Sequence, residues 1–389
     1  MDLGDPDLYR DETRFASWRA FVAEDAVVFS EPGASPSGFW SVFSHRACRQ
    51  VLAAGGPFTS EYGMLIGFDA DHPDRGGGKM IVATDGPAHT RLRRILGRFL
   101  SPGELAGLGR FIDDEIGRQL AVLRSSGDAP VDVATGIGPR LPAAVVCQLL
   151  GVPQSDRDEL IRLTDSAFAS PDSDSSASQT ADAHTEIFFY FHDRIEQCRR
   201  SPGSDLISAL LTADGLSTDE VLANCYNLLI GGNQTSRHLI TGAFLALARH
   251  PVLPADGSRA VDELARWLSP GMHVLRVATD DVNVSGRRIR RGEAVVAWLA
   301  AANRDPAVFD APGELRWDRA PNPHLSFGHG VHHCMGAQLA RMEAGRLLTA
   351  LARQTAGISC GEPVTTRSNL IQGFRSLPVS IDWRASVPV

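Results

Sequence analysis

One cysteine of this chain lies in a stretch whose residue types and spacing suit a metal ligand. Cys334 is the eighth residue of the run FGHGVHHCMGAQLAR, residues 327–341. Three glycines flank it, and an apolar helical pattern starts directly after it. Free amides at the start of a helix stabilise negative charge, so this position favours the thiolate form, which is the form that binds metals. Without this context, a lone cysteine would be interpreted as a buried free thiol.

The other five cysteines show no pattern of their own. The sequence contains no Cys-x-x-Cys pair and no zinc-site spacing. This scatter is typical of reduced thiols in the cytosol rather than of a disulfide framework. These cysteines are Cys48, Cys147, Cys198, Cys225 and Cys360.

With its context, the run 327–341 resembles the haem-binding loop of the cytochrome P-450 superfamily, the haem-thiolate monooxygenases. The resemblance extends over nearly the whole chain. It implies haem b as the cofactor, Cys334 as the axial iron ligand, and Phe327 and Gly336 as further residues of the cofactor site. A cysteinate ligand pushes electron density onto the iron, which favours O–O cleavage. The expected activity is therefore oxidation of an organic substrate with O2.

The segment Glu263-Leu264-Ala265-Arg266 resembles the Glu-x-x-Arg pair of the same family. A spacing of three places both charges on one helix face. Arg266 lies 68 residues before Cys334, which is where the resemblance requires it. In the family this pair is joined by an arginine before the cysteine loop, here Arg319, and its role is structural.

Four further residues match the family's partners of the haem propionates. His89 and Arg93 resemble its His-x-x-x-Arg motif, and Arg276 and His332 match two more partners. Two buried carboxylates need cationic or donor partners, because an unpaired buried charge is costly. Each of these residues alone would be assigned to the surface or the core, and it is their joint match that indicates haem contact.

The residues Gly231 to Thr235, GGNQT, align with the family's oxygen-binding motif, in which an acid precedes the threonine. Here that position carries Gln234, whose amide cannot relay protons as a carboxylic acid does. Thr235 and Gln234 are the expected catalytic residues. Three readings stay open: protons arrive through solvent and Thr235, Gln234 only pairs with the backbone, or the reaction is a coupling, cyclisation or nitration that needs fewer protons.

Segments that match the family's pocket walls are 62–81, 227–235, 272–275 and 370–374. The expected substrate-binding residues are Gly231, Gly232, His273, Val274, Ile371 and Gln372. Apolar walls with a few polar anchors suit a mid-sized, partly polar molecule. The chain resembles actinobacterial natural-product tailoring enzymes, and whether its substrate is free or tethered to a carrier protein stays open. A second hypothesis is a catalytically idle haem protein that recruits a carrier-bound substrate.

The charge balance limits the partners. Asp and Glu outnumber Lys and Arg 46 to 38, so no global field attracts nucleic acid or anionic lipid. Arg91, Arg94 and Arg98 form a local basic group. The resemblance assigns this group to docking of a ferredoxin, which receives its electrons from a ferredoxin reductase. No apolar stretch reaches the length of a membrane span, and the N-terminus lacks signal-peptide features. We therefore expect a cytoplasmic monomer.

The elements around these residues indicate one domain over residues 1–389. The predicted fold is mainly α with small β-sheets, the cytochrome P-450 fold, with haem between a long central helix and the helix after the cysteine. Apolar spacing predicts helices over 101–123, capped by Ser101, and over 218–250, capped at Thr218. Strands are expected at 39–43, 281–284 and 294–298, with a turn at 285–287 between the last two.

Two segments depart from this pattern. Residues 170–185 are rich in Ser and Asp and predict a mobile surface loop, a candidate lid. Residues 252–259 replace a helix that relatives commonly have, because the segment is too short and too rich in Pro and Gly to form more than a turn. This apparent deletion puts details of reductase docking in doubt.

Overall fold

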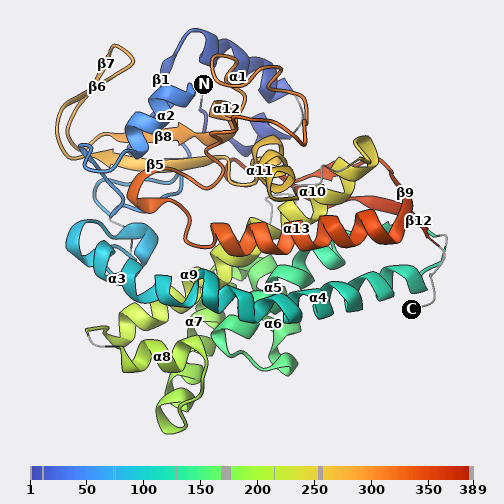
Figure 1. Cartoon of the computed structure of the whole chain (residues 1–389). Helices are drawn as coiled ribbons and strands as arrows, with labels where there is room; N and C mark the ends of the chain where they lie inside the picture. Colours follow the sequence, from blue (N-terminus) through green and yellow to red (C-terminus); the bar gives the residue numbers. More distant parts are fainter. Residues whose placement is uncertain are drawn as a thin grey trace.

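The computed structural model describes residues 2–10, 13–72, 74, 76–127, 129–167, 177–213, 215–252 and 257–384. Within them, helices dominate and the strands form small sheets, which confirms the expected fold class (Figure 1). The α-helices are α1 (Thr13–Ala23), α2 (His45–Leu52), α3 (Gly86–Phe99), α4 (Pro102–Ser125), α5 (Ile137–Leu150), α6 (Arg157–Ala167), α7 (Ala177–Arg200), α8 (Leu206–Thr212), α9 (Thr218–Gln234), α10 (Ser236–Arg249), α11 (Gly257–Leu268), α12 (Leu299–Ala302) and α13 (Ala337–Gln354). Short 3-10 helices are η1 (Pro6–Tyr9), η2 (Ile81–Ala83), η3 (Gln154–Asp156) and η4 (Gly330–His332).

The strands lie mainly at one side of the molecule, above the helical layer in Figure 1. They are β1 (Val27–Ser30), β2 (Phe39–Val42), β3 (Phe58–Thr59), β4 (Val131–Asp132), β5 (His273–Ala278), β6 (Val282–Val284), β7 (Arg287–Ile289), β8 (Ala294–Trp298), β9 (Thr355–Cys360), β10 (Val364–Thr365), β11 (Phe374–Ser376) and β12 (Pro378–Trp383). The largest described sheet has the order β1-β2-β8-β5-β3, with β2 and β8 parallel and the other pairs antiparallel.

The turn expected at 285–287 is present but joins other strands than expected. Ser285 and Gly286 both have positive φ, 47° and 80°, as a tight two-residue hairpin turn requires. Such a turn returns the chain at once, so β6 pairs with the adjacent β7. Strand β8, which was expected to follow this turn, instead pairs with β5 and β2.

The helix expected over 218–250 is divided into α9 and α10 at Thr235. Thr235 Oγ1 donates to the carbonyl of Gly231 at 3.1 Å, a contact to the preceding turn that bends helices. The amides of His238 and Leu239 both point to the carbonyl of Thr235, which tightens the following turn. The N-cap is Ser217 rather than Thr218, with a complete capping box to Glu220.

The helical core lies where α4, α5, α10, α11 and α13 meet. The helix expected over 101–123 is confirmed as α4, and Ser101 caps it through the Glu104 amide. Its apolar face, from Leu105 to Leu123, packs into one buried cluster with α10 and α13. This core fixes α13, and with it the cysteine loop, against the rest of the molecule. None of the helices in the described ranges is both long and apolar enough to cross a membrane.

The two irregular segments have different outcomes. Of the loop expected over 170–185, residues 170–176 lie outside the described residues, while 177–185 are the first turns of α7, which corrects the expectation there. In the other segment, α10 ends at Arg249 and α11 begins at Gly257. Residues 257–259 are thus the start of α11, which corrects the expectation of no more than a turn there, whereas residue 252 is not helical and 253–256 lie outside the described residues.

Candidate active site

The cysteine loop turns on glycines that no other residue could replace without strain. Gly328 and Gly330 both have φ of +72°, which side chains rarely adopt. A Cβ at Gly330 would lie 2.2 Å from the carbonyl oxygen of Leu52 at the end of α2, so the loop packs directly on that helix. The loop closes with the Cys334 amide donating to the Phe327 carbonyl at 2.8 Å.

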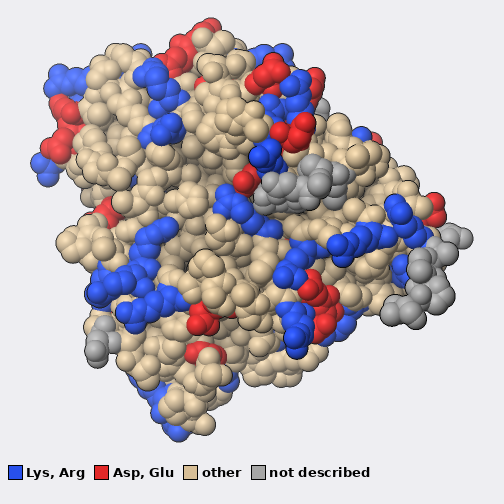
Figure 2. All heavy atoms as spheres, in the orientation of Figure 1, with Lys and Arg blue, Asp and Glu red and all other residues tan. Residues whose placement is uncertain are grey.

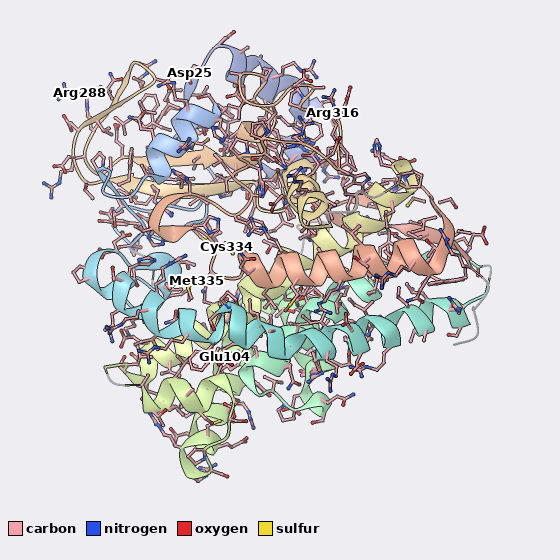
Figure 3. The ribbon with its side chains drawn as sticks, viewed as in Figure 1. Asp25, Glu104, Arg288, Arg316, Cys334 and Met335 are labelled. Atoms are coloured by element: carbon pink, nitrogen blue, oxygen red, sulfur yellow. The ribbon has the colours of Figure 1, made fainter. Side chains whose placement is uncertain are left out.

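Cys334 is the one exposed cysteine of the six, and it lies at the start of α13 (Figure 3). Desolvation by the surrounding protein raises the pKa of its thiol. The amides of Gly336 and Ala337 and the charges of Arg93 and Arg341 act in the opposite direction and lower that pKa. The helix start therefore directs donors at the sulfur, as the sequence predicts, and leaves this thiol open to a ligand.

A buried ion-pair network connects α11 to the segment that leads into the cysteine loop. Arg266 forms a two-pronged pair with Glu263, both N–O distances being 2.7 Å, and both side chains are fully buried. Arg319 Nε lies 3.0 Å from both oxygens of Glu263, which confirms the partner expected from the sequence. Arg266 also donates to backbone carbonyls of the segment before the loop, those of Asn303, Pro312 and Glu314.

The structure gathers the four expected propionate partners. The rings of His89 and His332 lie 4.3 Å apart between centroids. Burial, above all, lowers the pKa of His89 to about 4, and the electrostatic effects of His332, Arg93 and Arg276 act in the same direction. The charge of Arg93 lowers the pKa of both His89 and Cys334, so the cluster is close enough to the thiol to act on it electrostatically.

Two of these groups are buried without the partner that their chemistry needs. Nε2 of His89 has no hydrogen-bond partner although it is buried. Desolvation lowers the pKa of Arg276 to about 10, and its hydrogen bond is to the carbonyl of Leu275 rather than to a carboxylate. Buried donors of this kind fit the carboxylates of a haem, since a buried cation is stable only when it is paired.

Asp85 is a site residue that the sequence reasoning missed. It precedes α3, and its Oδ1 lies 2.8 Å from Nε2 of His332. Its Oδ2 accepts from the Ser60 amide and the Thr59 hydroxyl at 2.6 Å. His332 thus already has a carboxylate partner, which leaves Arg93, Arg276 and His89 as the donors without one. The sequence Thr84-Asp85-Gly86 could have indicated that Asp85 is the N-cap of α3, but not that it pairs with His332.

Replacing Arg276 with methionine is expected to weaken haem binding about 10- to 100-fold, the worth of one charge-assisted hydrogen bond of roughly 1.5–3 kcal/mol. The same change removes a desolvated charge, so the thermal stability of the haem-free protein should stay equal or rise. Haem titration and thermal unfolding measure the two effects. Unchanged haem affinity in both Arg276→Met and Arg93→Ala would contradict the assignment, and Arg288→Met, at an exposed surface pair, is the control.

The glycines of the oxygen-binding motif face different surroundings. A Cβ at Gly231 would meet nothing within 4 Å, so this position borders open space. At Gly232 a Cβ would lie 2.5 Å from Val146 of α5, so this glycine permits helix packing. Gly231 and Thr235 therefore stay candidates for contact with substrate or oxygen. Gly232, in contrast, allows α9 to pack closely against α5.

In this structure the side chain of Gln234 is buried and bonded to the backbone, which does not suit contact with substrate or oxygen. It is 7% exposed, and its Nε2 donates to the backbone carbonyl of Thr164 on α6 at 2.9 Å. Asn233 donates to the Thr164 hydroxyl at 3.0 Å. These bonds support the reading in which Gln234 pairs with the backbone. Thr164 lies 70 residues away, and no signal in the sequence indicated this contact.

The polar anchors expected at the substrate pocket are bonded inside the protein. Both ring nitrogens of His273 have backbone partners, Asn369 O and Ile66 N. Gln372 accepts from Arg14 at 3.3 Å and donates to the carbonyl of Leu268. His273 thus has no free ring nitrogen for its predicted role, whereas the Gln372 amide keeps one N–H, and Val274 and Ile371 remain apolar candidates for the wall.

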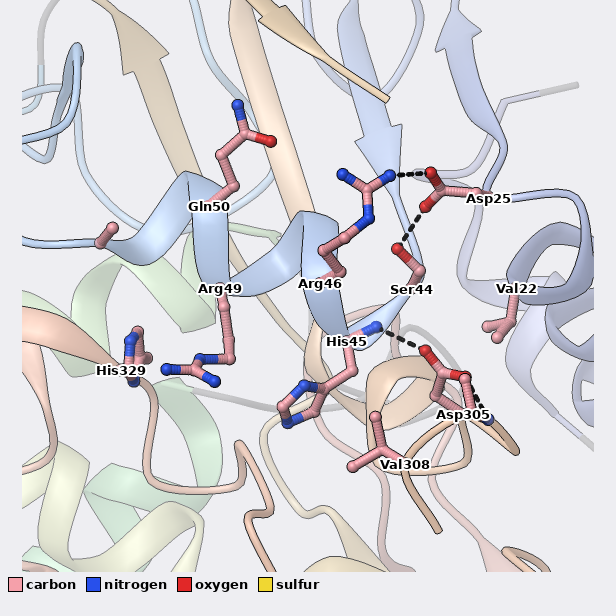
Figure 4. Close-up of a pocket in the computed structure, with 12 residues that line it drawn as sticks. Val22, Asp25, Ser44, His45, Arg46, Arg49, Gln50, Asp305, Val308 and His329 are labelled. Atoms are coloured by element: carbon pink, nitrogen blue, oxygen red, sulfur yellow. Dashed lines mark hydrogen bonds and ion pairs between the residues drawn. The ribbon is translucent and has the colours of Figure 1, made fainter. Parts of the chain in front are cut away.

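A surface pocket lies between α2, the end of α1 and residues 305–308, and His329 of the cysteine loop borders it (Figure 4). Figure 4 shows Arg49 of α2 extending toward His329 of the loop, and the amide of His45 donates to Asp305 at 2.9 Å. Asp25 is paired with Ser44 and Arg46. None of the predicted site residues lines this pocket. It is therefore separate from the candidate substrate site.

Comparison with known proteins identifies the class to which this geometry belongs. A family profile described as Cytochrome P450 matches residues 258–354, from α11 to the end of α13. The chain is 34% identical to cytochrome P450 NovI of Streptomyces niveus, over 98% of this chain and 96% of that protein. The chain therefore belongs to the cytochrome P450 family of haem-thiolate monooxygenases, and its cofactor is a haem.

Solved structures agree with this assignment. P450 OxyD, involved in the biosynthesis of vancomycin-type antibiotics, is 50% identical with a TM-score of 0.93, over 98% of this chain and 100% of that one. P450BioI, solved in complex with an acyl carrier protein ligated to hexadec-9Z-enoic acid, is 26% identical with a TM-score of 0.84, over 97% and 100%. The similarity thus extends over essentially the whole fold.

Proposed function

We propose that this chain holds haem b and uses it, with O2 and electrons from an acidic ferredoxin, to oxidise an organic substrate in a natural-product tailoring step. The observation that carries the proposal is one accessible thiol, Cys334, beside a cluster of buried donors that lack an anion. When bound, a thiolate-ligated haem supplies the oxidising chemistry. The similarity to OxyD supports the tailoring role.

Haem b is favoured over a covalently attached haem. The sequence has no Cys-x-x-Cys-His motif, so thioether attachment has no site. Cys334 would ligate the iron, and Arg93, Arg276 and His89 would hold the propionates, with His332 kept beside them by its bond to Asp85. Phe327 contributes to the loop itself: Arg341 stacks on its ring at 4.5 Å and is anchored by Asp262. Gly336 precedes α13 and directs its amide at the sulfur.

Thr235, which lies between α9 and α10, is the residue that we assign to proton movement at the substrate side. Its hydroxyl donates to the Gly231 carbonyl, and this leaves the oxygen able to accept a hydrogen bond from water. Gln234 is bonded to the Thr164 carbonyl, so we assign it the structural role of fixing the end of α9 to α6.

Turnover with purified ferredoxin and reductase tests the proposal, because a catalytically idle haem protein would bind substrate without forming product. Candidate substrates are screened by their effect on the haem spectrum, each as the free acid and attached to a carrier protein. The P450BioI complex supports the carrier-bound form. A spectral response and product only from the tethered form would establish carrier recognition, and equal response from both would refute it.

Gln234→Glu is expected to leave product per electron unchanged or lower. The Gln234 amide donates to a carbonyl, and a carboxylate there would face the Thr164 oxygen instead. The lost bond costs roughly 1–3 kcal/mol of stability. In contrast, Thr235→Ala should increase electron consumption without product. A clear rise in product per electron in Gln234→Glu would show that an acid at this position restores an ordinary proton relay, contrary to the role assigned to Gln234.

We assign ferredoxin docking to the basic group on α3. Figure 2 shows Lys and Arg side chains gathered over α3, on the face that also carries α13. Arg94 and Arg98 are exposed, whereas Arg91 is already paired with Glu220. Two free cations beside the cysteine loop suit an acidic partner on a chain of net charge −8.

Reversing both charges in Arg94→Glu/Arg98→Glu is expected to lower the ferredoxin-supported rate about tenfold at low salt, because steering of this kind changes association rates by factors of ten or more. The loss should shrink as ionic strength rises. The control is Arg140→Glu/Arg162→Glu, an equal double charge reversal at exposed positions of α5 and α6. Equal rates in the double variant and the control would place the docking surface elsewhere.

A further inference from the structure

Three separate segments that line the proposed substrate pocket meet at the start of β5. Backbone bonds join them in pairs: Leu275 N to Met64 O at 2.9 Å, and Met272 N to Leu370 O at 2.8 Å. A bridge between Gly271 and Ile371 continues the second contact. The strand β5 thus lies between residues 64–66 on one side and residues 369–372 on the other.

The side chain of His273 connects the same two segments. Nδ1 lies 3.0 Å from the carbonyl oxygen of Asn369, and the amide of Ile66 lies 3.3 Å from Nε2. A carbonyl can only accept and an amide can only donate, so Nδ1 must carry the proton and Nε2 must be unprotonated. The contacts therefore select one neutral tautomer of the ring.

The surroundings hold the ring in this position. His273 is 1% exposed, and its ring packs 5.3 Å from that of Trp298 on β8, between centroids. Burial lowers the pKa of His273 to about 4, although the bond to Asn369 raises it. The ring thus stays neutral and keeps both bonds near neutral pH.

The segment 369–372 has further anchors outside the pocket. Asn369 Nδ2 donates to the carbonyl of Gly4 at 2.5 Å. Arg14 of α1 donates to Gln372 and to the carbonyl of Tyr9. Residues 64–66 are bonded to β5 through the Met64 carbonyl, and the Leu65 side chain is 45% exposed. The bonds of the His273 ring to Ile66 and Asn369 therefore link residues 64–66 to the anchored segment 369–372.

We propose that His273 is a positioning residue that sets the spacing between residues 64–66 and residues 369–372, and so the shape of the substrate pocket, without touching the substrate. The proposal rests on the proposed function for the identity of the pocket. It predicts that each ring nitrogen controls one wall, which conservative substitutions can separate. The amide of asparagine can replace Nδ1–H, and the carbonyl oxygen of glutamine can replace Nε2.

Hydrogen exchange of the haem-free protein tests the two bonds independently of catalysis. In His273→Phe, the amide of Ile66 and those of Met272 and Gln372 should exchange at least tenfold faster than in the unchanged protein. His273→Gln should restore protection at Ile66 only, and His273→Asn at Met272 and Gln372 only. Unchanged exchange at Ile66 in His273→Phe, or equal exchange in all three variants, would overturn the proposal.

Azole binding to the haem-loaded protein tests the effect on the pocket. Imidazole needs only access to the iron, whereas 4-phenylimidazole also needs the pocket walls. His273→Phe is expected to weaken 4-phenylimidazole about five- to tenfold and to leave imidazole unchanged, because a looser wall must be ordered on binding. Unchanged affinity for both azoles would refute the positioning role, whereas failure of both to bind the unchanged protein would instead refute the proposed haem site.

Discussion

Cys334→Ser is expected to remove the thiolate signature from the spectrum of the reduced, CO-bound protein and to lower turnover more than about 100-fold. Changes around a metal ligand commonly cost 10- to 100-fold, so loss of the ligand itself should cost more. A serine hydroxyl keeps the shape of the loop but stays protonated, and it cannot donate electron density as a thiolate does. The spectrum and the rate of product formation are measured together.

The matched control is Cys360→Ser. Cys360 is the only other cysteine that is not buried, and it lies on β9 at the far end of α13. This variant should keep both the signature and the rate. If Cys334→Ser retained the signature, or if Cys360→Ser lost it, the assignment of the axial ligand would be wrong.

Arg266→Ala is expected to lower the free energy of unfolding by about 3–5 kcal/mol, the usual cost of removing one partner of a buried ion pair. The change leaves Glu263 with a single charged partner, Arg319, and removes the donors to three backbone carbonyls. The segment that leads into the cysteine loop should then loosen, and haem should be lost at lower denaturant concentration. Chemical denaturation with and without haem measures both effects.

Arg316→Ala provides the comparison within the same segment. Arg316 pairs with Asp310 and Glu314, but its side chain is 40% exposed. Surface pairs of this kind contribute little to stability because solvent screens them, so Arg316→Ala should destabilise the protein far less than Arg266→Ala. Arg266→Lys should lie between the two, since an ammonium cannot form the two-pronged pair. A loss below about 1 kcal/mol in Arg266→Ala would contradict the structural role of the pair.

The parts of the site that the sequence predicts are those carried by short, regular motifs. The glycines around Cys334, the three-residue spacing of Glu263 and Arg266, and the four-residue spacing of His89 and Arg93 each determine a local arrangement. Glycine at positive φ and charges on one helix face follow from backbone geometry alone. For this reason the loop, its helix and the ion-pair network match the structure closely.

The parts that the sequence does not predict depend on contacts between distant segments. Gln234 bonds Thr164 across 70 residues, and His273 bonds Ile66 across 207. A residue type shows that a side chain can form hydrogen bonds, but not whether substrate or backbone takes them. The break between α9 and α10 at Thr235 is not predicted either. The apolar periodicity continues through this position, and the sequence does not show that the Thr235 hydroxyl donates to the carbonyl of Gly231.

A crystal structure of the haem-loaded protein tests the central claim most directly. We expect the iron to be bonded to the sulfur of Cys334, and the propionates to lie against Arg93, Arg276 and His89. We also expect Gly231 and Thr235 on the opposite face of the haem, with Gln234 still bonded to Thr164. An iron ligated by a neighbouring histidine such as His333, or propionates placed away from Arg93 and Arg276, would contradict the account.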